Sequence, residues 1–363
     1  MTNRVAIIRR EYRVDGGAEQ AVNSFLRAYK ALGFHVTLVC EKWNEQSEWV
    51  DQMVTLKVFG FSRFSRLRSF TRSAEAWIQS NSDILVQAHE WVDGADVLRL
   101  GDGLHTYWLD ILRKQRSPFG RFFLRLSSFH RFKVRKERQC LQNERLKKII
   151  VNSEFVRQQL EHQYPKVATQ AVTITNVCRD FYQLHSIPIR PISGKIILGF
   201  VGSGWERKGL RLLLKALSKL SDDFELLVYG VDKASDSFKD VARQLGVIHK
   251  ICWCGVRENA ESIYTEIDCL VISSLYDPCP NVAVEAIVAG VPVIASSETG
   301  ISDFSSAKAI QIFESGSVED LVNKINGMRQ ITDEDRSELR DLSFQFSEAN
   351  MQYNLNDMLK QLR

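Results

Sequence analysis

The stretch YDPCPNVAVEAIVAGVPVIA, residues 276–295, decides the fold because it joins a helix start to a following strand. Pro280 fixes φ in the range of a first helical turn, and the apolar residues 282–288 predict a buried helix. Gly290 predicts where that helix stops, and residues 291–295 predict the next strand. A helix that runs directly into an apolar strand is typical of α/β architecture.

The start of this helix is a candidate anion site. The backbone N–H groups near Asn281 and Val282 have no carbonyl partner within the helix, and the helix dipole favours a diphosphate there. Glu285, one turn further, can accept hydrogen bonds from ribose hydroxyls, and Asp277 precedes the helix. The alternative is a buried helix whose two carboxylates only cap it or pair with basic side chains.

Length and composition predict two domains. The chain has 363 residues, of which 44% are apolar and 25% are charged, as in soluble globular proteins. No run approaches the roughly 18 apolar residues that span a bilayer. Arg9, Arg10 and Glu11 interrupt any secretory signal, so we expect a cytosolic protein.

The cysteines favour a reducing compartment. There are seven of them, an odd number, and they form no disulfide framework. Cys252 and Cys254 flank Trp253 in a predicted strand, so both face the same way. Because no second pair of ligands lies nearby in the sequence, we expect buried thiols there and not a zinc site.

Short β-rich runs alternate with helical patterns from end to end, which predicts α/β domains with mainly parallel sheets. The strands are predicted at residues 5–8, 36–40, 55–59, 84–87, 97–100, 148–151, 195–201, 225–228, 250–252, 269–272, 291–295 and 309–312. Residues 184–194 contain two prolines and end in a serine and a glycine, so they predict a linker. We therefore expect an N-terminal domain at 1–183, a second at 195–346, a cleft between them, and a closing helix at 347–363.

Two loops carry the features of phosphate or sugar binding. Gly16 and Gly17 follow the first predicted strand and precede a helix, so they allow close backbone approach to an anion or a sugar. A plain tight turn is the alternative, since the dinucleotide fingerprint is absent. Residues 202–209, GSGWERKG, follow a strand and open a helix, with Gly202 at their start. The helix dipole disfavours the positive charges of Arg207 and Lys208 at that helix end unless an anion binds there, which favours a phosphate site. The alternative to a phosphate site is a solvated turn.

These pieces together resemble the retaining glycosyltransferases of family four, which have the GT-B fold of two Rossmann-like domains facing across a cleft. The early Gly-Gly turn, residues 176–181, the 202–209 loop and the acid-x7-Glu pattern of Asp277 and Glu285 occur in that family's order. The resemblance covers nearly the whole chain. It implies a nucleotide-sugar donor bound by the second domain and an acceptor bound by the first.

The resemblance also implies roles for single residues. Arg207 and Lys208 would bind the donor diphosphate, Glu285 the ribose, and the backbone at Asn281 and Val282 the phosphates. Asp277 stands where the family usually has Glu and would contact the donor sugar, with a shorter reach. Pro280 and Asn281 replace the usual Gly-hydrophobic pair.

In the first domain, residues 101–106, GDGLHT, follow a predicted strand and match the family's catalytic region. Asp102 would orient an acceptor hydroxyl, and His105 would bind the donor sugar or the leaving phosphate. A structural turn is the alternative. At residues 86–90, which include His89, we favour a structural role.

The mechanism that the resemblance implies is front-face transfer with retention, in which a donor phosphate oxygen helps to deprotonate the acceptor. No pair of carboxylates is placed as in glycosidases. That scheme needs no metal and no cofactor beyond the nucleotide sugar. Residues 333–335, Asp-Glu-Asp, match D-x-D by letters but follow Thr332, so we expect a helix start rather than a metal site.

The strongest charge asymmetry lies at residues 113–148, where lysines and arginines far outnumber acids and phenylalanines are interleaved. On one continuous helix, Phe122 and Phe129 would share a side flanked by Arg121, Arg125 and Lys133, which favours an anionic membrane surface. Nucleic acid is a competing partner, but no nucleic-acid motif accompanies the patch, so we expect none. The structural alternative is a helix whose aromatics pack inside.

We therefore expect a metal-independent hexosyltransferase that uses an NDP-sugar, with UDP as the expected nucleotide. The segment 99–110 and the Tyr-Asp-Pro variant look most like bacterial lipopolysaccharide-core transferases, which implies a glycolipid or oligosaccharide acceptor at the inner face of the cytoplasmic membrane. Two alternatives stay open. One is a nucleotide-sugar epimerase of the same fold, and the other is a non-catalytic nucleotide- or glycan-binding protein at the membrane.

Overall fold

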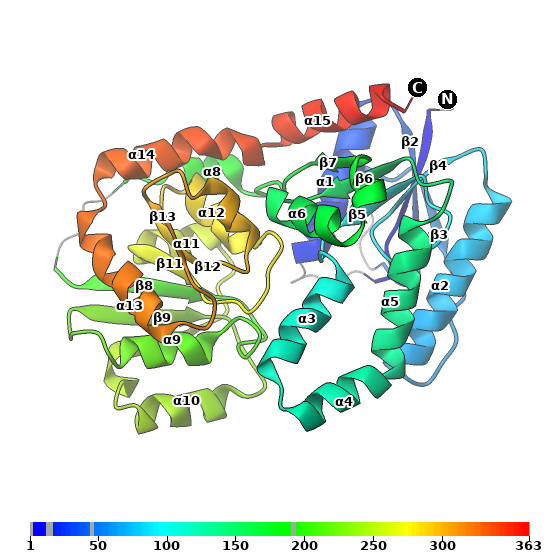
Figure 1. Cartoon of the computed structure of the whole chain (residues 1–363). Helices are drawn as coiled ribbons and strands as arrows, with labels where there is room; N and C mark the ends of the chain where they lie inside the picture. The colour runs from blue at the N-terminus through cyan, green and yellow to red at the C-terminus, as the bar shows by residue number, and fades with distance from the viewer. Residues whose placement is uncertain (1–2, 12–16, 44–46, 190–193, 363) are drawn as a thin grey trace. The chain divides into compact units, whose positions relative to one another are not determined.

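The computed structural model describes residues 3–11, 17–43, 47–189 and 194–362. The chain forms two compact units (Figure 1). Unit 1 is Met1–Val177 together with Glu348–Arg363, and unit 2 is Cys178–Ser347. Each unit is built on one parallel sheet, which confirms the predicted α/β class.

Unit 1 holds a seven-stranded sheet in the order β3-β2-β1-β4-β5-β6-β7. Its strands are β1 (Arg4–Ile8), β2 (His35–Cys40), β3 (Gln52–Thr55), β4 (Leu85–Ala88), β5 (Val97–Leu100), β6 (Lys148–Val151) and β7 (Ala171–Thr173). Successive side chains of β1 point to opposite faces, so Val5 and Ile7 enter one apolar cluster while Ala6 and Ile8 enter another. Both faces of the sheet are therefore buried, as in doubly wound folds.

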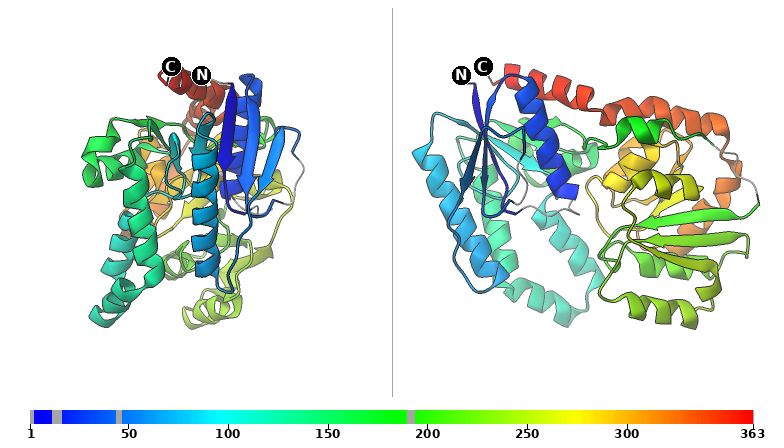
Figure 2. Two further views of the ribbon diagram at one scale, coloured as in Figure 1. Left: turned by 90° about the vertical axis from the view of Figure 1, so that its right-hand side faces the viewer. Right: turned by 180° about the vertical axis from the view of Figure 1, so that it is seen from behind.

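Helices cover the two faces of this sheet (Figure 2). They are α1 (Gly17–Ala31), α2 (Arg63–Ser80), α3 (His105–Gln115), α4 (Pro118–Leu126), α5 (Ser128–Leu141), α6 (Glu154–Gln163), α7 (Pro165–Ala168) and α15 (Glu348–Lys360). The predicted closing helix is α15, and it packs on α1 in the first unit. Its apolar residues Met351, Leu355 and Met358 are buried in the same cluster as Phe25 of α1.

Unit 2 holds a six-stranded parallel sheet in the order β10-β9-β8-β11-β12-β13. The strands are β8 (Ile196–Val201), β9 (Phe224–Tyr229), β10 (Ile251–Gly255), β11 (Cys269–Ile272), β12 (Val293–Ser296) and β13 (Ile310–Phe313). The α-helices are α8 (Phe181–His185), α9 (Leu210–Leu217), α10 (Ser235–Gln244), α11 (Ala260–Glu266), α12 (Asn281–Val288), α13 (Val318–Gly327) and α14 (Asp333–Leu342). Short 3-10 turns lie at Ile248–Lys250, Gly300–Phe304, Met328–Gln330 and Ser343–Phe346. One contiguous apolar core joins these elements.

The strand order reverses at β8, which lies between β9 and β11. In open α/β sheets, ligands bind beyond the carboxyl ends of the strands at such a switch point. The loop that follows β8 and the loop that follows β11 therefore meet where a ligand is expected. These are the 202–209 loop and the 273–280 loop that leads into α12.

Several local predictions need correction. The third strand lies at Gln52–Thr55 and not at 55–59, and β7 was not predicted. The division between the units falls after Val177, because Leu184, placed in the linker by the sequence pattern, is fully buried in the core of unit 2. Cys252 is exposed and Cys254 is only half-buried, so neither is the buried thiol predicted; Ile251 and Trp253, on the alternate side of β10 from Cys252, pack on the core, with Trp253 against Trp205.

Candidate active site

The loop after β8 is shaped by glycine and by tight hydrogen bonds. Gly209 has φ of 78°, and a Cβ atom there would lie 1.8 Å from the backbone oxygen of Ser273, so only glycine fits. Trp205 is buried, and its backbone N–H donates to Asp232 Oδ2 at 2.9 Å. Its indole N–H donates to the Gly202 carbonyl at 2.9 Å, so the turn closes on itself. These contacts fix the conformation of the loop at the edge of the sheet.

This loop brings the two predicted cations to the loop after β11. Lys208 Nζ lies 2.5 Å from Asp277 Oδ2, and both side chains are largely buried. Arg207 is exposed, and its guanidinium donates to the Tyr276 carbonyl at 3.3 Å. The Leu275 N–H donates back to the Arg207 carbonyl at 2.9 Å. Three of the predicted site residues, Arg207, Lys208 and Asp277, therefore lie together in unit 2.

Asp277 is fixed by its backbone as well as by its ion pair. Its N–H donates to the Glu298 carbonyl, and its carbonyl accepts from Gly300 N–H, each at 3.0 Å. Only 9% of Asp277 is exposed. A carboxylate at this depth needs a partner, and Lys208 supplies it.

Helix α12 begins directly beyond this pair. The N–H groups of Ala283 and Val284 donate to the Pro280 carbonyl, so Asn281 and Val282 stand before the first intrahelical bonds. Pro280 occupies the N-cap position and has no side chain that could cap the helix. The positive end of the helix dipole is therefore directed at the loop, as the sequence predicts. The predicted stop is also confirmed, since Gly290 has φ of 70° after the helix ends at Val288.

Glu285 sits one turn into α12 and is partly buried. The hydroxyl of Tyr264, from α11, lies 2.7 Å from Glu285 Oε2 and 3.0 Å from the Val282 carbonyl. Burial raises the pKa of Glu285 to about 7, and Asp180 adds to the rise while the Tyr264 hydrogen bond opposes it. The carboxyl group therefore changes charge near neutral pH.

In unit 1, charged side chains gather where strands end. Arg9, which follows β1, lies 3.2 Å from Glu19 of α1 and 3.4 Å from Glu90, which follows β4. Burial lowers the pKa of Arg9, but the carboxylates of Glu90, Asp102 and Glu19 outweigh it and raise the pKa above its ordinary value. Asp102 itself is exposed in the turn after β5. Of the predicted pair of glycines, Gly17 is the first residue of α1, and Gly16 lies outside the described residues.

His105 is the first residue of α3 and packs against α5. Its ring Nε2 lies 3.1 Å from His130 Nδ1, and the two rings stack at 5.2 Å. Burial, then Lys133 and His130, lower the pKa of His105 to about 3, so the ring is neutral at physiological pH. His105 can therefore form a hydrogen bond to a ligand but cannot supply a charge. His89 has the structural role we favoured, since it is buried, 2.7 Å from Gln87 and edge-on to Phe25.

The basic segment is not one continuous helix. α4 ends at Leu126, and the Ser127 side chain accepts from the His130 N–H to begin α5. Phe122 and Phe129 therefore belong to different helices and do not share one helix face. Instead it packs edge-on against Phe64 and His105, with Lys133 Nζ 5.5 Å from its ring centre.

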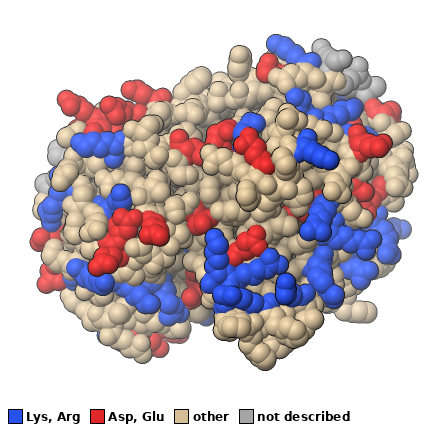
Figure 3. Space-filling view, viewed as in Figure 1, with Lys and Arg blue, Asp and Glu red and all other residues tan. Residues whose placement is uncertain are grey.

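Four large apolar side chains of α4 are exposed instead: Phe119, Phe122, Phe123 and Leu126. Arg125 is exposed beside them, and Arg121, also exposed, donates to the carbonyls of Arg113 and Arg116 at the end of α3. Figure 3 shows lysine and arginine side chains gathered on the face over α3 and α5. Of the five residues predicted to contact a membrane, Arg121, Phe122 and Arg125 thus lie on the surface, and Phe129 and Lys133 pack inward.

Two features of this region were not predicted. Glu137 of α5 is fully buried and accepts hydrogen bonds from the His105 N–H and the Tyr164 hydroxyl, which fixes the start of α3. Tyr264 was also missed as the partner of Glu285. The only sequence signal for Glu137 was an acidic residue within a strongly basic segment. No sequence signal pointed to Tyr264, because its partner Glu285 lies 21 residues away.

The remaining acidic motif caps a helix. Thr332 accepts from the Asp335 N–H, and Asp335 accepts from the Thr332 N–H, so residues 333–335 begin α14 as expected. Across the described ranges, no group of three or more His, Cys, Asp or Glu side chains is placed to hold a metal ion. In the same part of the chain, no helix combines the length and apolar character needed to cross a bilayer.

Comparisons with known proteins agree with this arrangement. Two family models match the chain: Glycosyltransferase Family 4 at residues 15–177 and Glycosyl transferases group 1 at residues 186–341. The uncharacterized glycosyltransferase MJ1607 of Methanocaldococcus jannaschii is 35% identical over 113 residues, which are 30% of this chain and 29% of that protein. The lipopolysaccharide core biosynthesis glycosyltransferase LpsE of Rhizobium meliloti is 26% identical over 110 residues, 30% of this chain and 32% of that protein. The matched regions thus span about a third of these relatives' length.

Solved structures match over almost the whole chain. WaaG, a glycosyltransferase involved in lipopolysaccharide biosynthesis, has a TM-score of 0.74 at 19% identity and covers 96% of this chain and 94% of its own. HepE of Anabaena, in complex with UDP and glucose, has a TM-score of 0.70 at 15% identity and covers 99% of both chains. At these identities the likeness is one of fold, and the two family models name the family. The chain belongs to the glycosyltransferases of family four and has the GT-B fold.

Proposed function

We propose that this glycosyltransferase transfers a hexose from UDP-hexose to a cell-envelope glycolipid, with retention of configuration. The observation that carries the proposal is the arrangement at the switch point of unit 2. There Arg207 and Lys208 and the start of α12 surround the position of a diphosphate, and Asp277 lies 2.5 Å from Lys208. Backbone N–H groups and two cations are the groups that stabilise a leaving diphosphate.

Each donor residue then has a chemical task. Arg207 and Lys208 neutralise the charge that develops on the leaving diphosphate. Glu285 accepts hydrogen bonds from the ribose hydroxyls, and Tyr264 holds its carboxylate in place. Asp277 accepts a hydrogen bond from a sugar hydroxyl while it shares Lys208 with the phosphate. A donor phosphate oxygen assists deprotonation of the acceptor hydroxyl on the same face, which leads to retention and requires no metal.

The acceptor belongs to unit 1 in this proposal. Asp102 is exposed in the turn after β5 and orients the acceptor hydroxyl, whereas the neutral ring of His105 contributes a hydrogen bond. HepE, crystallised with UDP and glucose, supports the choice of UDP. WaaG, involved in lipopolysaccharide biosynthesis, supports a lipopolysaccharide acceptor, and LpsE supports the core as the acceptor class. The exposed phenylalanines of α4 beside Arg121 and Arg125 would hold the protein peripherally at the cytoplasmic leaflet.

The donor half of this proposal is tested by ligand-induced stabilisation. UDP-, GDP- and ADP-hexoses are screened by thermal shift, and a UDP-hexose should raise the melting temperature most. Lys208→Ala should remove most of that stabilisation and lower the transfer rate by about a hundredfold or more, because it removes a cation from the leaving group. Lys215→Ala, an exposed lysine of α9, is the control and should change neither.

Two outcomes would contradict the proposal. If Lys208→Ala binds UDP-hexose and transfers sugar like the unchanged protein, Lys208 has no part in the reaction. If UDP-hexose is converted to its epimer without any acceptor, the protein is an epimerase of the same fold.

A further inference from the structure

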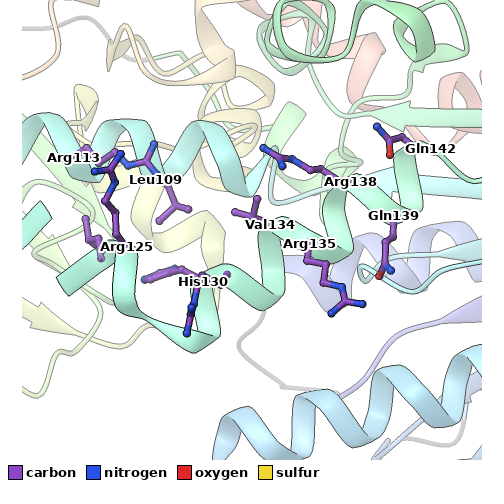
Figure 4. Close-up of a pocket in the computed structure, with 11 residues that line it drawn as sticks. Leu109, Arg113, Arg125, His130, Val134, Arg135, Arg138, Gln139 and Gln142 are labelled. Atoms are coloured by element: carbon purple, nitrogen blue, oxygen red, sulfur yellow. The ribbon is translucent and has the colours of Figure 1, made fainter. Parts of the chain in front are cut away.

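A second candidate site lies wholly within unit 1, among α3, α4 and α5. These helices line a cavity of about 620 Å³ that is open to solvent and has a volume typical of small-molecule sites. Arg113 of α3, Arg125 of α4, and Arg135 and Arg138 of α5 line it, and Figure 4 shows Arg113, Arg125 and Arg138 directed toward one another while Arg135 points away from them. Arg131 of α5 also lines the cavity.

The charge of this cavity is one-sided. It is lined by Leu109, Arg113, Leu124, Arg125, His130, Arg131, Val134, Arg135, Arg138, Gln139 and Gln142, and no acidic side chain is among them. Arg113 pairs with Asp110 at 2.7 Å. Within the described ranges, no carboxylate lies within 4.0 Å of the guanidinium groups of the other four arginines. Like charges gathered without counter-ions repel one another, so a bound anion would stabilise the arrangement.

Three of these arginines begin on the same face of α5. Arg131, Arg135 and Arg138 are spaced four and three residues apart, so they share one face of α5. The opposite face is packed, because Phe129 contacts Phe64 and His105. The cations nearby also act on His130: burial first, then Lys133 and Arg116, lower its pKa.

The chemistry of the lining selects the ligand. Arginine binds phosphate through two parallel hydrogen bonds, and five arginines exceed what one phosphate can use. Leu109, Leu124 and Val134 add an apolar surface that suits a sugar ring or the stem of a head group. Single-stranded nucleic acid is bound largely by stacking of its bases on aromatic side chains, and no aromatic ring other than the imidazole of His130 lines the cavity among the described residues.

We propose that this cavity binds a molecule that carries at least two phosphate groups, either a phosphorylated glycan or a phosphorylated lipid head group. This proposal rests on the proposed function in one respect: the bound molecule is the acceptor of the transfer reaction or a part of that acceptor. Binding in the cavity does not depend on the donor site of unit 2.

Binding is measured by calorimetry with glucose 1,6-bisphosphate and by flotation with vesicles of phosphatidylinositol 4-phosphate, which carries two phosphate groups, in phosphatidylcholine. Unphosphorylated glucose and pure phosphatidylcholine vesicles are the negative probes. If glucose 1,6-bisphosphate binds and substitution of the cavity arginines weakens that binding, the phosphate groups that the cavity recognises belong to a phosphorylated glycan. Binding of the phosphatidylinositol 4-phosphate vesicles without binding of the soluble bisphosphate identifies a lipid head group.

The variant Arg131→Ser/Arg135→Ser/Arg138→Ser should weaken phosphate binding by about tenfold or more, because each charged hydrogen bond contributes substantially. A control that removes the same charge from exposed positions outside the cavity, Lys114→Ser/Lys166→Ser/Lys219→Ser, should stay within about threefold of the unchanged protein. Arg135→Gln alone serves if the triple variant does not fold, and it should weaken binding by about threefold.

The proposal is overturned if neither phosphate probe binds the unchanged protein, or if the control weakens binding as much as the cavity variant does. UDP affinity is measured in parallel. Retained UDP binding in the cavity variant separates loss of this site from failure of the donor site.

Discussion

Replacing Glu285 with Gln should make the protein more stable and less able to bind its donor. The folded-state pKa of Glu285 is about 7, against an ordinary value of 4.5. Because the folded-state pKa is raised, the neutral form is favoured by folding, and this contribution is complete below pH 4.5 and is lost as the pH rises through 7. The difference corresponds to at most about 3 kcal/mol at pH 8.

Glu285→Gln keeps the shape and the hydrogen bond from Tyr264 but carries no charge at any pH. At pH 5 the difference in melting temperature between the two proteins should shrink to about a quarter of its value at pH 8. At pH 8 the variant should unfold later, by roughly 6 to 12 °C for a unit of this size. UDP affinity should fall in the variant, since a neutral amide replaces the carboxylate that accepts from the ribose.

Scanning calorimetry at pH 5, 6, 7 and 8 follows unit 2 in both proteins. Glu338→Gln, an exposed position of α14, is the matched control and should leave the pH dependence unchanged. A buried, raised-pKa carboxyl at Glu285 is refuted if Glu285→Gln is no more stable than the unchanged protein at pH 8, or if the difference in melting temperature is as large at pH 5 as at pH 8.

Two further predictions concern the donor loop and α4. Gly209→Ala should lower the melting temperature and abolish UDP binding, because its methyl group would overlap a backbone oxygen 1.8 Å away, whereas Gly204→Ala, with φ of 72° and open space around it, should show only the smaller cost of backbone strain. Equal effects of the two substitutions on UDP binding would contradict this account. Phe119→Ser/Phe122→Ser should reduce flotation with anionic liposomes several-fold while UDP affinity is kept, and Phe344→Ser, at another exposed phenylalanine, should reduce neither. Unchanged flotation of the α4 variant would contradict the proposal that the exposed phenylalanines of α4 bind the membrane.

Sequence patterns predicted the strands best where an apolar run was short, continuous and bounded by polar residues. The predicted bounds of β5, β6 and β11 agree with the structure. β7 was missed because it has only three residues, one of them threonine, and no periodicity can be read from so few. The break between α4 and α5 was missed because the phenylalanine spacing continues across Ser127, although this serine and its neighbour Ser128 are typical of a helix start.

The candidate site was predictable where the chemistry is local in sequence. Arg207 and Lys208 stand beside the glycines that shape their loop, and Asp277 stands beside the prolines before α12. What the sequence could not provide is the pairing of Lys208 with Asp277, 69 residues apart, or of Tyr264 with Glu285. Such contacts follow from the order of strands in the sheet, and no local pattern specifies that order.

The position of α15 has a consequence for how the chain folds during synthesis. Unit 1 needs Met351, Leu355 and Met358 to close one face of its sheet, yet the whole of unit 2, Cys178–Ser347, is translated first. At ribosomal speed these 170 residues take roughly 10 to 30 seconds. During that interval the apolar surface around Phe25 and Tyr29 lacks its cover, so the second unit can complete its core before the first. The nascent N-terminal half is therefore the stage at which this protein most needs protection from aggregation.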